Sequence, residues 1–564
     1  MYDGTNYRSY ARIQDFLNSE LTPRNSGMWF YAHAGGLADF QFVLAYLLDN
    51  PKPGMTVSLA FSGSSAIIVR IQKGKYSWYL LDSYWLIRQP LREIGEWMGN
   101  FKGGEQGSTD IFYGPLSELI PYNRNDCIIL YDAIRSLEDT VLSLGGRLEM
   151  TIASTAMGLF RRKYLKREIH TSDDLNRISS EAYIASRVEV YEHEVLEDAE
   201  YWDINSSFPF SMTFEAPGNL IGTSRRLKDD NSIKLVRATV KIGDCDLPPV
   251  PYRTPEDRRI YFPTGSWTGW FSGVDIQLIE ESGHRIDSIE QVMTFESFTD
   301  TKDYAQEIYE LRKNSTHEPE RVVLKFLLNS LYGKFAEGEL KSKYLVNMPE
   351  EYYRGPQYDP KTGIGWSFVT PGVHEIVEKR EIAHRHVPIA MHITALSRKW
   401  IYQYMAKASK VHYCDTDGFS VPKKDSSKYQ NSKELGGLKK EDDRPYAHYH
   451  APKAYVYQKA LPDGEQGPLQ MRVKAKGFSR IKDEEGETRR LGYGDFCQLL
   501  EHKEVHIDQF SRVKSMLKAG KTRPHEVERH KTFRDSINPK RYFPPDGGRS
   551  RPWHVSELVA KPKS

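Results

Sequence analysis

The sequence predicts a multidomain protein of the α/β and α+β classes, and three observations lead to that prediction. The chain has 564 residues, which is too many for a single hydrophobic core and indicates two to four domains. Its first quarter alternates short apolar runs with helical patterns, which is typical of an α/β domain. The later part combines strand–turn–strand patterns with a helical hairpin.

The composition indicates a globular protein without a dominant charge. Charged residues make up 27%, aromatic residues 12%, and the formal net charge is +2, which argues against wholesale disorder. Basic residues nevertheless cluster locally, in 161–167, at Lys474 and Lys476, and in 518–551. A groove for nucleic acid needs only such local charge, although solvated surface is the alternative explanation.

The cysteines and the apolar runs exclude several classes of protein. The 4 cysteines are scattered without a CxxC pair, so we expect neither a zinc site nor a disulfide framework. A reducing compartment is therefore expected. No run of about 18 apolar residues predicts a membrane span, and no secretory signal is visible. We expect residence in the host cytoplasm, with the mitochondrion as the alternative, although no transit peptide is visible.

The expected elements follow the apolar periodicity along the chain. The region from Lys440 onward is basic and rich in Pro and Gly, so we expect it to be irregular, with a 525–552 tail that is more loop than core. The expected strands are 28–31 and 65–70, followed by strand–turn–strand units in 187–212 and 410–421. The expected helices are 39–48, 125–144, 303–313, a second hairpin helix beginning near Pro319 and ending near Gly333, and 389–408.

Two aspartates are placed where metal chemistry needs them. Asp203 ends an apolar strand, and Asp417 lies in the turn Asp415-Thr-Asp-Gly418. Two carboxylates from separate strands are the minimal protein contribution to a site for two Mg²⁺ ions, for which Mn²⁺ can substitute. We expect Asp203 and Asp417 to be catalytic metal ligands, with the adjacent Ile204 in the metal site and Asp415 as a weaker third candidate. An exposed turn is the alternative for Asp415 to Gly418.

A helix face and one aromatic side chain supply the other parts that nucleotide addition requires. Lys325, Asn329, Tyr332 and Gly333 follow the spacing i, i+4, i+7 and i+8, so we expect them to share one helix face. Phe208 follows Asp203 closely, and a flat ring under the sugar leaves no room for a 2′-hydroxyl. An amphipathic surface helix and a core Phe are the alternatives. Together, the segments predict a template-directed nucleic-acid polymerase.

The same segments resemble the motifs of family B DNA polymerases, in particular the protein-primed branch of phages, viruses and linear plasmids. The matching segments are Asp203-x-x-Ser206-x-Phe208-Pro209, Lys325-x-x-x-Asn329-Ser330-x-Tyr332-Gly333, Asp415-Thr416-Asp417, Lys453-Ala-Tyr455, Ile393 to Arg398 and Lys474-Ala-Lys476-Gly-Phe478. The resemblance extends from about residue 28 to about residue 555.

The resemblance implies a right-hand fold of palm, fingers and thumb, preceded by a partial RNase H-like exonuclease domain, and a DNA-directed DNA polymerase activity. It implies nucleotide-binding roles for Ser207, Phe208, Lys325, Asn329, Tyr332, Arg312 and Lys313. It implies primer- or template-binding roles for Ser206, Ser330, Gly333, Lys453, Tyr455, Lys474 and Lys476. The implied partners are primer–template DNA, dNTPs, a terminal protein primer and a single-stranded DNA-binding protein. We expect a monomer without a membrane partner.

Several positions depart from the family pattern. Ser207-Phe208 stands where the family usually has Leu-Tyr, and Gly418 stands where it usually has Ser. Tyr183-Ile-Ala-Ser186 stands where the family often has Tyr-x-Gly-Gly. Sugar selection survives the first change because Phe keeps the steric wall, but the hydroxyl that Tyr would supply is lost.

The exonuclease motifs of the family are incomplete in this sequence. His33 to Asp39 matches the second motif but lacks its Asn, and Tyr122-x-x-x-Asp126 matches the third. The first motif, Asp-x-Glu, is absent, so residual motif residues Asp39, Tyr122 and Asp126 offer about half of the carboxylates that a two-metal nuclease needs. We expect weak or absent proofreading, through decay of the domain or because the true start lies upstream.

These observations give an expected domain layout, and two functions compete with the main prediction. The alternatives are a catalytically reduced relative that binds DNA or a replication partner, and a nuclease that uses Asp39, Tyr122 and Asp126. The expected domains are 1–150, the partial exonuclease; 151–212, linker and first palm part; 213–302, palm insertion and first terminal-protein region; 303–335, fingers; 336–390, second insertion; 391–480, palm; and 481–564, thumb and tail.

Overall fold

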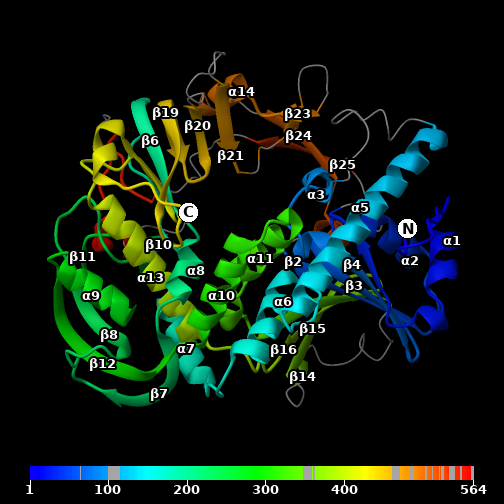
Figure 1. The fold of residues 1–564 in the computed structure, drawn as a ribbon, viewed down its shortest axis with the longest axis horizontal. Helices are drawn as coiled ribbons and strands as arrows, with labels where there is room; N and C mark the ends of the chain where they lie inside the picture. Colours follow the sequence, from blue (N-terminus) through cyan, green and yellow to red (C-terminus); the bar gives the residue numbers. More distant parts are fainter. Residues whose placement is uncertain are drawn as a thin grey trace. The chain divides into compact units, whose positions relative to one another are not determined.

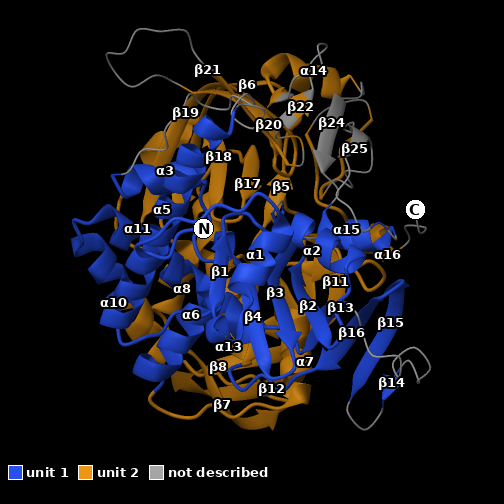
Figure 2. Cartoon of the chain, turned by 90° about the vertical axis from the view of Figure 1, so that its right-hand side faces the viewer, with its two compact units in different colours: residues 1–165, 307–384, 509–527 blue, residues 166–306, 385–508, 528–564 orange. Residues whose placement is uncertain are grey.

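A computed structural model describes most of the chain, which divides into two compact units (Figure 2). Unit 1 comprises residues 1–165, 307–384 and 509–527, and unit 2 comprises 166–306, 385–508 and 528–564. The described residues are 1–37, 39–63, 65–99, 115–346, 358–359, 363–459, 470–476, 478, 480–482, 488–501, 505–510, 512–519, 521, 526–531, 540–545 and 549–559.

Unit 1 is built on one eight-stranded sheet with the strand order β1-β4-β3-β2-β13-β16-β15-β14. β1 and β4 are parallel, and each of the other neighbouring pairs is antiparallel. The residues predicted as a second insertion therefore extend the sheet of the N-terminal region. The strands are β1 (Trp29–Ala32), β2 (Met55–Ser62), β3 (Ser65–Lys73), β4 (Tyr76–Asp82), β13 (Leu340–Val346), β14 (Tyr358–Asp359), β15 (Ile364–Thr370) and β16 (Val373–Lys379).

Helices cover this sheet because alternate strand residues are apolar and need burial. The core of unit 1 includes Val57, Leu59, Val69 and Ile71 of β2 and β3, each fully buried. The helices of unit 1 are α1 (Ile13–Glu20), α2 (Asp39–Asp49), α3 (Leu91–Trp97), α5 (Leu116–Ser143), α6 (Ile152–Leu159), the π-helix Phe160–Tyr164, α11 (Glu318–Ser330) and α15 (Val513–Lys518). The helix α10 (Asp300–Asn314) runs from unit 2 into unit 1.

Unit 2 contains a seven-stranded antiparallel sheet, the palm sheet, with the order β21-β20-β19-β6-β18-β17-β5. One face packs on α13 (Val387–Met405), which also contacts α8 (Ser207–Met212) (Figure 1). Trp202 and Ile204 point into this core. The strands are β5 (Val188–Val190), β6 (Leu196–Ile204), β17 (Tyr413–Asp415), β18 (Gly418–Pro422), β19 (Leu438–Ala451), β20 (Ala454–Lys459) and β21 (Gln470–Ala475).

A second sheet of unit 2, with the order β11-β8-β12-β7, is built entirely from residues within 213–302. Its helix α9 begins with a capping box, in which the side chains of Ser272 and Asp275 each accept a hydrogen bond from the other residue's backbone N–H. Its strands and helix are β7 (Ala216–Ser224), β8 (Ile233–Ile242), β11 (Gly265–Ser272), β12 (Arg285–Phe298) and α9 (Gly273–Glu281). The remaining described elements of unit 2 include α7 (Asp173–Ala182), β22 (Arg480–Lys482), β23 (Thr488–Arg490), α14 (Tyr493–Leu500) and α16 (Val555–Val559).

The expectation of irregular structure past Lys440 is wrong. β19, β20 and β21 continue the palm sheet, because alternating residues such as Ala447, Tyr449 and Val456 are buried against it. The described part of the tail is also packed, since Arg541 is fully buried and its Nη2 donates to Oδ1 of Asp246 at 2.8 Å. Pro539, Gly547 and Gly548 of the predicted tail, and Gly477 of the Lys474 motif, lie outside the described residues.

Most other expected elements match the structure, with shifted bounds. The predicted helix 125–144 is longer and begins at Leu116, so that Pro121 lies inside it. The second hairpin helix ends at Ser330, and Tyr332 and Gly333 belong to a following 3₁₀ segment, Tyr332–Ala336. Among the described helices, none has the length and apolar character that crossing a bilayer requires.

Candidate active site

The two metal-ligand candidates meet where two central strands of the palm sheet lie side by side. Asp203 is the penultimate residue of β6, and its register partner on β18 is Gly418. The backbone carbonyl of Asp417 accepts the N–H of Ile204 at 2.9 Å. The structure therefore brings Asp203 and Asp417 together, as the sequence predicted. The side chain of Ile204 is fully buried, so only its carbonyl could contribute to a metal site.

The turn that carries Asp417 is held by its backbone. The N–H of Thr416 donates to the carbonyl of Arg187 at 2.8 Å, and the N–H of Asp417 donates to the carbonyl of Asp415 at 2.9 Å. Thr416 adopts φ of +69°, a left-handed conformation that costs energy for a β-branched residue and persists only where the surroundings enforce it. Such local strain is typical of functional turns.

The electrostatics of this pair favour a cation. Burial, with the nearby carboxylates of Asp417 and Glu441, raises the pKa of Asp203 to about 7. Burial, with Asp415, raises the pKa of Asp417 to about 6. Each carboxylate is thus destabilised in its charged form, first by burial and then by its neighbours. A bound divalent cation would remove that destabilisation, so the donor set fits Mg²⁺, which prefers carboxylate oxygens.

Glu441 is a residue of this site that the sequence reasoning missed. The register of β19 against β6 shifts between Lys440 and Asp442, which makes Glu441 the bulged residue. Its carboxylate accepts a hydrogen bond from Nζ of Lys439 at 2.8 Å, and Lys439 is the register partner of Asp203. Only the pairing of two distant strands reveals this neighbour, although the charged run from Lys439 to Arg444 was a visible signal.

Asp415 differs from the other two aspartates because it has a cationic partner. Its Oδ1 lies 3.2 Å from Nζ of Lys453 and accepts from Oγ1 of Thr416 at 3.1 Å. Its Oδ2 accepts a hydrogen bond from the hydroxyl of Tyr413 at 3.3 Å. The structure thus places Lys453, a predicted primer-binding residue, beside the turn from Asp415 to Gly418. No cluster of three or more His, Cys, Asp or Glu side chains able to hold a metal is found among the described residues.

In the segment after Asp203, Ser207 lies in the core and Phe208 is closer to the surface. Ser207 is 1% exposed, and its hydroxyl lies 2.9 Å from that of Ser397 on α13. Its side chain is therefore part of the core and not available to a nucleotide. Ser206 adopts φ of +54° and precedes α8. Phe208, two residues on, is only partly buried.

A basic groove adjoins the turn from Asp415 to Gly418 within unit 2. Its volume is about 630 Å³, and Asp415 forms part of its wall. Lys474 of β21 and Lys476, which directly follows the end of that strand at Ala475, are both exposed. Arg490 of β23 also lines the groove and was missed by the sequence reasoning. Lys453, Tyr455 and Phe478 also line the groove.

The predicted nucleotide-binding helix lies in unit 1. Lys325 and Asn329 are exposed one turn apart on α11, and Nδ2 of Asn329 donates to the carbonyl of Lys325 at 2.9 Å. Ser330 ends α11, whereas Tyr332 and Gly333 follow in the 3₁₀ segment. At the end of α10, Arg312 is half-buried and Lys313 is exposed. Burial lowers the pKa of the Arg312 guanidinium.

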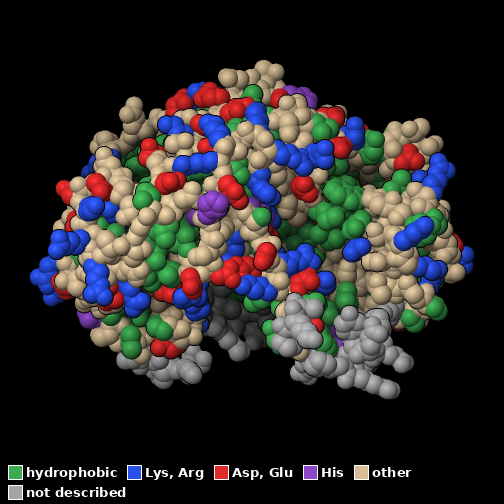
Figure 3. Space-filling model, turned by 90° about the horizontal axis from the view of Figure 1, so that it is seen from below, with side chains coloured by type: hydrophobic (Ala, Val, Ile, Leu, Met, Phe, Trp, Pro, Cys, Tyr) green, Lys and Arg blue, Asp and Glu red, His purple; other side chains and the backbone are tan. Residues whose placement is uncertain are grey.

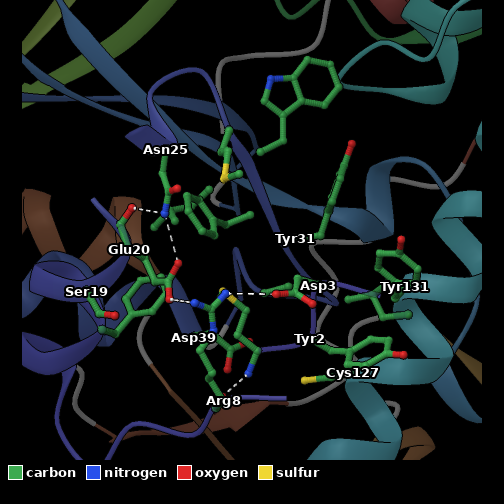
Figure 4. A pocket seen from close by; sticks show the side chains of 18 of the residues that line it. Tyr2, Asp3, Arg8, Ser19, Glu20, Asn25, Tyr31, Asp39, Cys127 and Tyr131 are labelled. Carbon is green, nitrogen blue, oxygen red and sulfur yellow. Dashed lines mark hydrogen bonds and ion pairs between the residues drawn. The ribbon is translucent and has the colours of Figure 1, made fainter. Parts of the chain in front are cut away.

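A cavity of about 940 Å³ in unit 1 contains part of the residual exonuclease motifs (Figure 4). Asp39, exposed at the start of α2, lines it. Tyr122 and Asp126 lie one turn apart on α5, the helix that contributes Cys127 and Tyr131 to the wall.

Two further carboxylates in this cavity are already paired with a cation. Nη1 of Arg8 lies 3.3 Å from Oε1 of Glu20, and Nη2 lies 3.3 Å from Oδ2 of Asp3 (Figure 4). Glu20 is 1% exposed and also accepts from Nδ2 of Asn25 at 3.3 Å. The sequence reasoning missed Asp3 and Glu20 because no motif connects them to Asp39. Asp3 and Glu20 are thus compensated by Arg8, whereas burial raises the pKa of Asp39, which lines the same cavity.

Charge on the molecular surface is mixed. On the face shown in Figure 3, basic and acidic side chains are interspersed, in agreement with a net charge of +2. Local basic character, as in the groove of unit 2, is therefore more informative than net charge.

The chain belongs to the family of type B DNA polymerases described as organellar and viral, because the sequence model of that family matches residues 108–410. It is 28% identical over 386 residues to a probable DNA polymerase of Neurospora intermedia, covering 64% of this chain and 39% of that protein. It is 27% identical over 358 residues to a probable DNA polymerase of Ascobolus immersus, covering 60% and 29%. The chain thus matches well under half the length of these curated relatives.

Solved structures show the same fold. The structure of Phi29 DNA polymerase complexed with primer–template DNA and incoming nucleotide aligns with a TM-score of 0.70 over 93% of both chains at 18% identity. The right-hand polymerase fold expected from the sequence is therefore confirmed.

Proposed function

We propose that this chain is a DNA-directed DNA polymerase that adds deoxynucleotides to a primer 3′-hydroxyl by a two-metal mechanism. The observation that supports this most strongly is the Asp203–Asp417 pair, whose raised pKa values of about 7 and about 6 reflect burial and neighbouring negative charge. The pair adjoins a basic groove and lies in a chain of the type B polymerase family.

The carboxylates of Asp203 and Asp417, with the carbonyl of Ile204, would hold two Mg²⁺ ions. Such ions polarise the attacking hydroxyl and the α-phosphate and stabilise the pyrophosphate that leaves. The protein holds the carboxylates at a fixed separation through the β6–β18 register. Phe208 is proposed to exclude a 2′-hydroxyl from the sugar position, which favours deoxynucleotides.

Basic and aromatic side chains of the groove are proposed to hold the primer end. Lys453 and Tyr455 flank the catalytic turn, and Lys474, Lys476 and Arg490 supply positive charge for backbone phosphates. Ser206, Ser330 and Gly333 are the remaining predicted primer or template contacts.

Lys325, Asn329, Tyr332, Arg312 and Lys313 are proposed to bind the triphosphate and base of the incoming nucleotide. An ammonium and a guanidinium suit phosphate oxygens. The exposed positions of Lys325 and Lys313 are compatible with this role.

We further propose that the polymerase serves a virus- or plasmid-like element and that its primer is a protein hydroxyl. The description of the family as organellar and viral supports the first part. The sheet β11-β8-β12-β7, inserted between the first two motifs, is the candidate contact for a terminal protein. A single-stranded DNA-binding protein is a further proposed partner.

Proofreading by this 564-residue chain is proposed to be weak or absent. In the cavity of unit 1, Asp3 and Glu20 are paired with Arg8. A two-metal nuclease needs several carboxylates that remain available to cations.

The test is extension of a labelled primer annealed to a longer template, with Mg²⁺ and dNTPs, by the parent and by Asp417→Asn. Extension by the parent and none by the variant supports the proposal. If neither protein extends the primer although both bind DNA, the chain is a binding protein instead. Replacing the primer by a candidate terminal protein and one labelled dNTP tests protein priming in the same format.

A further inference from the structure

The sheet face that carries the carboxylates continues into a buried group of aromatic side chains around one arginine. Alternate residues of a strand share a face, so Tyr201 lies on the side of Asp203, and Tyr413 on the side of Asp415. Two residues along a strand are about 6–7 Å apart. This group, the arginine–tyrosine cluster, consists of Tyr201, Tyr413, Arg444, Tyr449 and Tyr457.

Arg444 is the centre of the cluster. It is 3% exposed, and its guanidinium carbon lies 4.0 Å from the ring centroid of Tyr201 and 3.9 Å from that of Tyr457. Its Nε donates to Oδ1 of Asp442 at 2.7 Å. A planar, permanently charged guanidinium beside two rings interacts favourably with both π faces. The Tyr201 ring is therefore fixed against the arginine.

The ring of Tyr201 reaches the residue that follows Asp417. A Cβ added to Gly418 would lie 2.5 Å from Oη of Tyr201 and 2.8 Å from its Cε1 and Cζ. These distances are far inside van der Waals contact, so only glycine permits this approach. This contact gives a physical reason for Gly418 at a position where the sequence pattern favours serine.

We propose that Tyr201 is a positioning residue, which sets the place of Asp417 relative to Asp203 through its contact with Gly418. The inference rests on the proposed polymerase function, because it assigns a role in the same site. Gly418 is both the neighbour of Asp417 in the chain and the register partner of Asp203. A displacement of Gly418 therefore changes the separation of the two metal ligands.

The same arginine also reaches the other side of the catalytic turn. Nη1 of Arg444 donates to the hydroxyl of Tyr449 at 2.8 Å, and the Tyr449 ring is stacked on Tyr413 with centroids 4.6 Å apart at 7°. The Tyr413 hydroxyl donates to Asp415 at 3.3 Å and accepts from the N–H of Lys453 at 3.0 Å. One buried cation thus connects both strands that carry the turn.

The first variant is Gly418→Ser, which introduces the clash with Tyr201. We expect kcat for nucleotide addition to fall about 100-fold, because small displacements of reacting groups have effects of that size. The Kd for primer–template DNA should change less than about 2-fold, since the phosphate contacts are untouched. The Mg²⁺ concentration that gives half-maximal rate should rise.

The decisive variant is the double substitution Tyr201→Val with Gly418→Ser, which makes room for the serine. Tyr201→Val alone should lower kcat about 10-fold, because the ring no longer fixes the turn. The double variant should be close to Tyr201→Val and about 10-fold better than Gly418→Ser, a non-additivity that is expected of residues in contact. Gly494→Ser, on α14, is the matched control, since nothing lies within 4 Å of a Cβ added there.

An independent readout is Mn²⁺ affinity measured by electron paramagnetic resonance on the same four variants, after circular dichroism has shown that each is folded. If the parent extends DNA and Gly418→Ser is fully active, or the double variant is no better than Gly418→Ser, the inference is wrong. If the parent does not extend DNA, the proposed function fails. The non-additivity in Mn²⁺ affinity then decides separately whether Tyr201 positions the carboxylates.

Discussion

Both units of this chain contain neighbouring carboxylates, but the charge around these carboxylates differs. In unit 2, Asp203 and Asp417 are crowded by Glu441 and Asp415, and burial raises both pKa values. In unit 1, Asp3 and Glu20 are compensated by Arg8. The difference teaches that carboxylates which repel each other are prepared for a metal ion, whereas carboxylates already paired with a guanidinium are not.

The largest expected effect comes from removing one carboxylate of the palm sheet, which tests the proposed metal site of unit 2. Asp417→Asn keeps the size of the side chain and removes its charge, so we expect extension to fall roughly 1000-fold, which corresponds to about 4 kcal/mol. Single-turnover incorporation with saturating dNTP measures it. Asp425→Asn, in the same unit but facing Lys428 and Ser409, is the control. Unchanged incorporation by Asp417→Asn would contradict the assignment.

Sugar selection tests whether the side chain after Asp203 completes the palm site. Phe208→Val opens the space for a 2′-hydroxyl, so discrimination against ribonucleotides should fall about 10- to 100-fold, the range of a lost steric contact. The ratio of kcat/KM for dNTP and rNTP measures this. Phe208→Tyr keeps the ring and should keep the ratio. An unchanged ratio in Phe208→Val would show that another side chain excludes the hydroxyl.

The pH dependence of the stability of the metal-free protein tests whether the pKa of Asp203 is raised in the folded chain. Because the pKa of Asp203 is raised to about 7 in the folded chain, its carboxyl group favours the folded state when protonated, and this stabilisation is lost as the pH rises from about 4 to 7. Asp203→Asn should therefore stabilise the metal-free protein by about 2 kcal/mol at pH 8 and by almost nothing at pH 4. Urea unfolding in the presence of a chelator measures both values. Equal effects at the two pH values would contradict the raised pKa.

The basic groove of unit 2 should contribute to DNA affinity without contributing to chemistry. The double substitution of Lys474 and Lys476 by Ala should weaken primer–template binding about 10-fold at moderate salt and reduce the salt dependence of log Kd by about 1 to 2 units. Fluorescence anisotropy at several salt concentrations measures both. Lys241→Ala, which removes an exposed lysine of β8, is the control. A loss of affinity with an unchanged salt slope would mean that these lysines do not contact phosphates.

The smallest expected effect concerns unit 1. Asp39→Asn should leave the slow shortening of a labelled primer, measured without dNTPs, unchanged within about 2-fold, because Asp3 and Glu20 of this cavity are paired with Arg8 and a two-metal nuclease needs several available carboxylates. A clear loss of shortening in Asp39→Asn would mean that unit 1 edits after all.

The sequence predicted those parts of the site that each leave a signature within a short segment of the chain. Asp203, Asp415 and Asp417 were found because a turn or a strand end leaves a local signature, and the hairpin helices were found because 3.6-residue periodicity is local. Glu441, Arg490, Arg8 and the contact of Tyr201 with Gly418 were missed because they depend on strand register and packing between distant segments. The strands past Lys440 were missed because Pro, Gly and charged residues interrupt the alternation of apolar and polar residues in the sequence. Burial against the palm sheet stabilises these strands despite their low intrinsic strand propensity.

The measurement that tests the central claim most directly counts Mn²⁺ ions in a complex of the protein with dNTP and a primer that ends in a dideoxynucleotide. Electron paramagnetic resonance should detect about two ions per parent chain. The same count should persist in Asp39→Asn and fall in Asp417→Asn. Retention of both ions by Asp417→Asn would show that Asp417 of unit 2 is not a metal ligand. Loss of the ions in Asp39→Asn would place the metal site in unit 1. Either result would contradict the proposed two-metal site of unit 2.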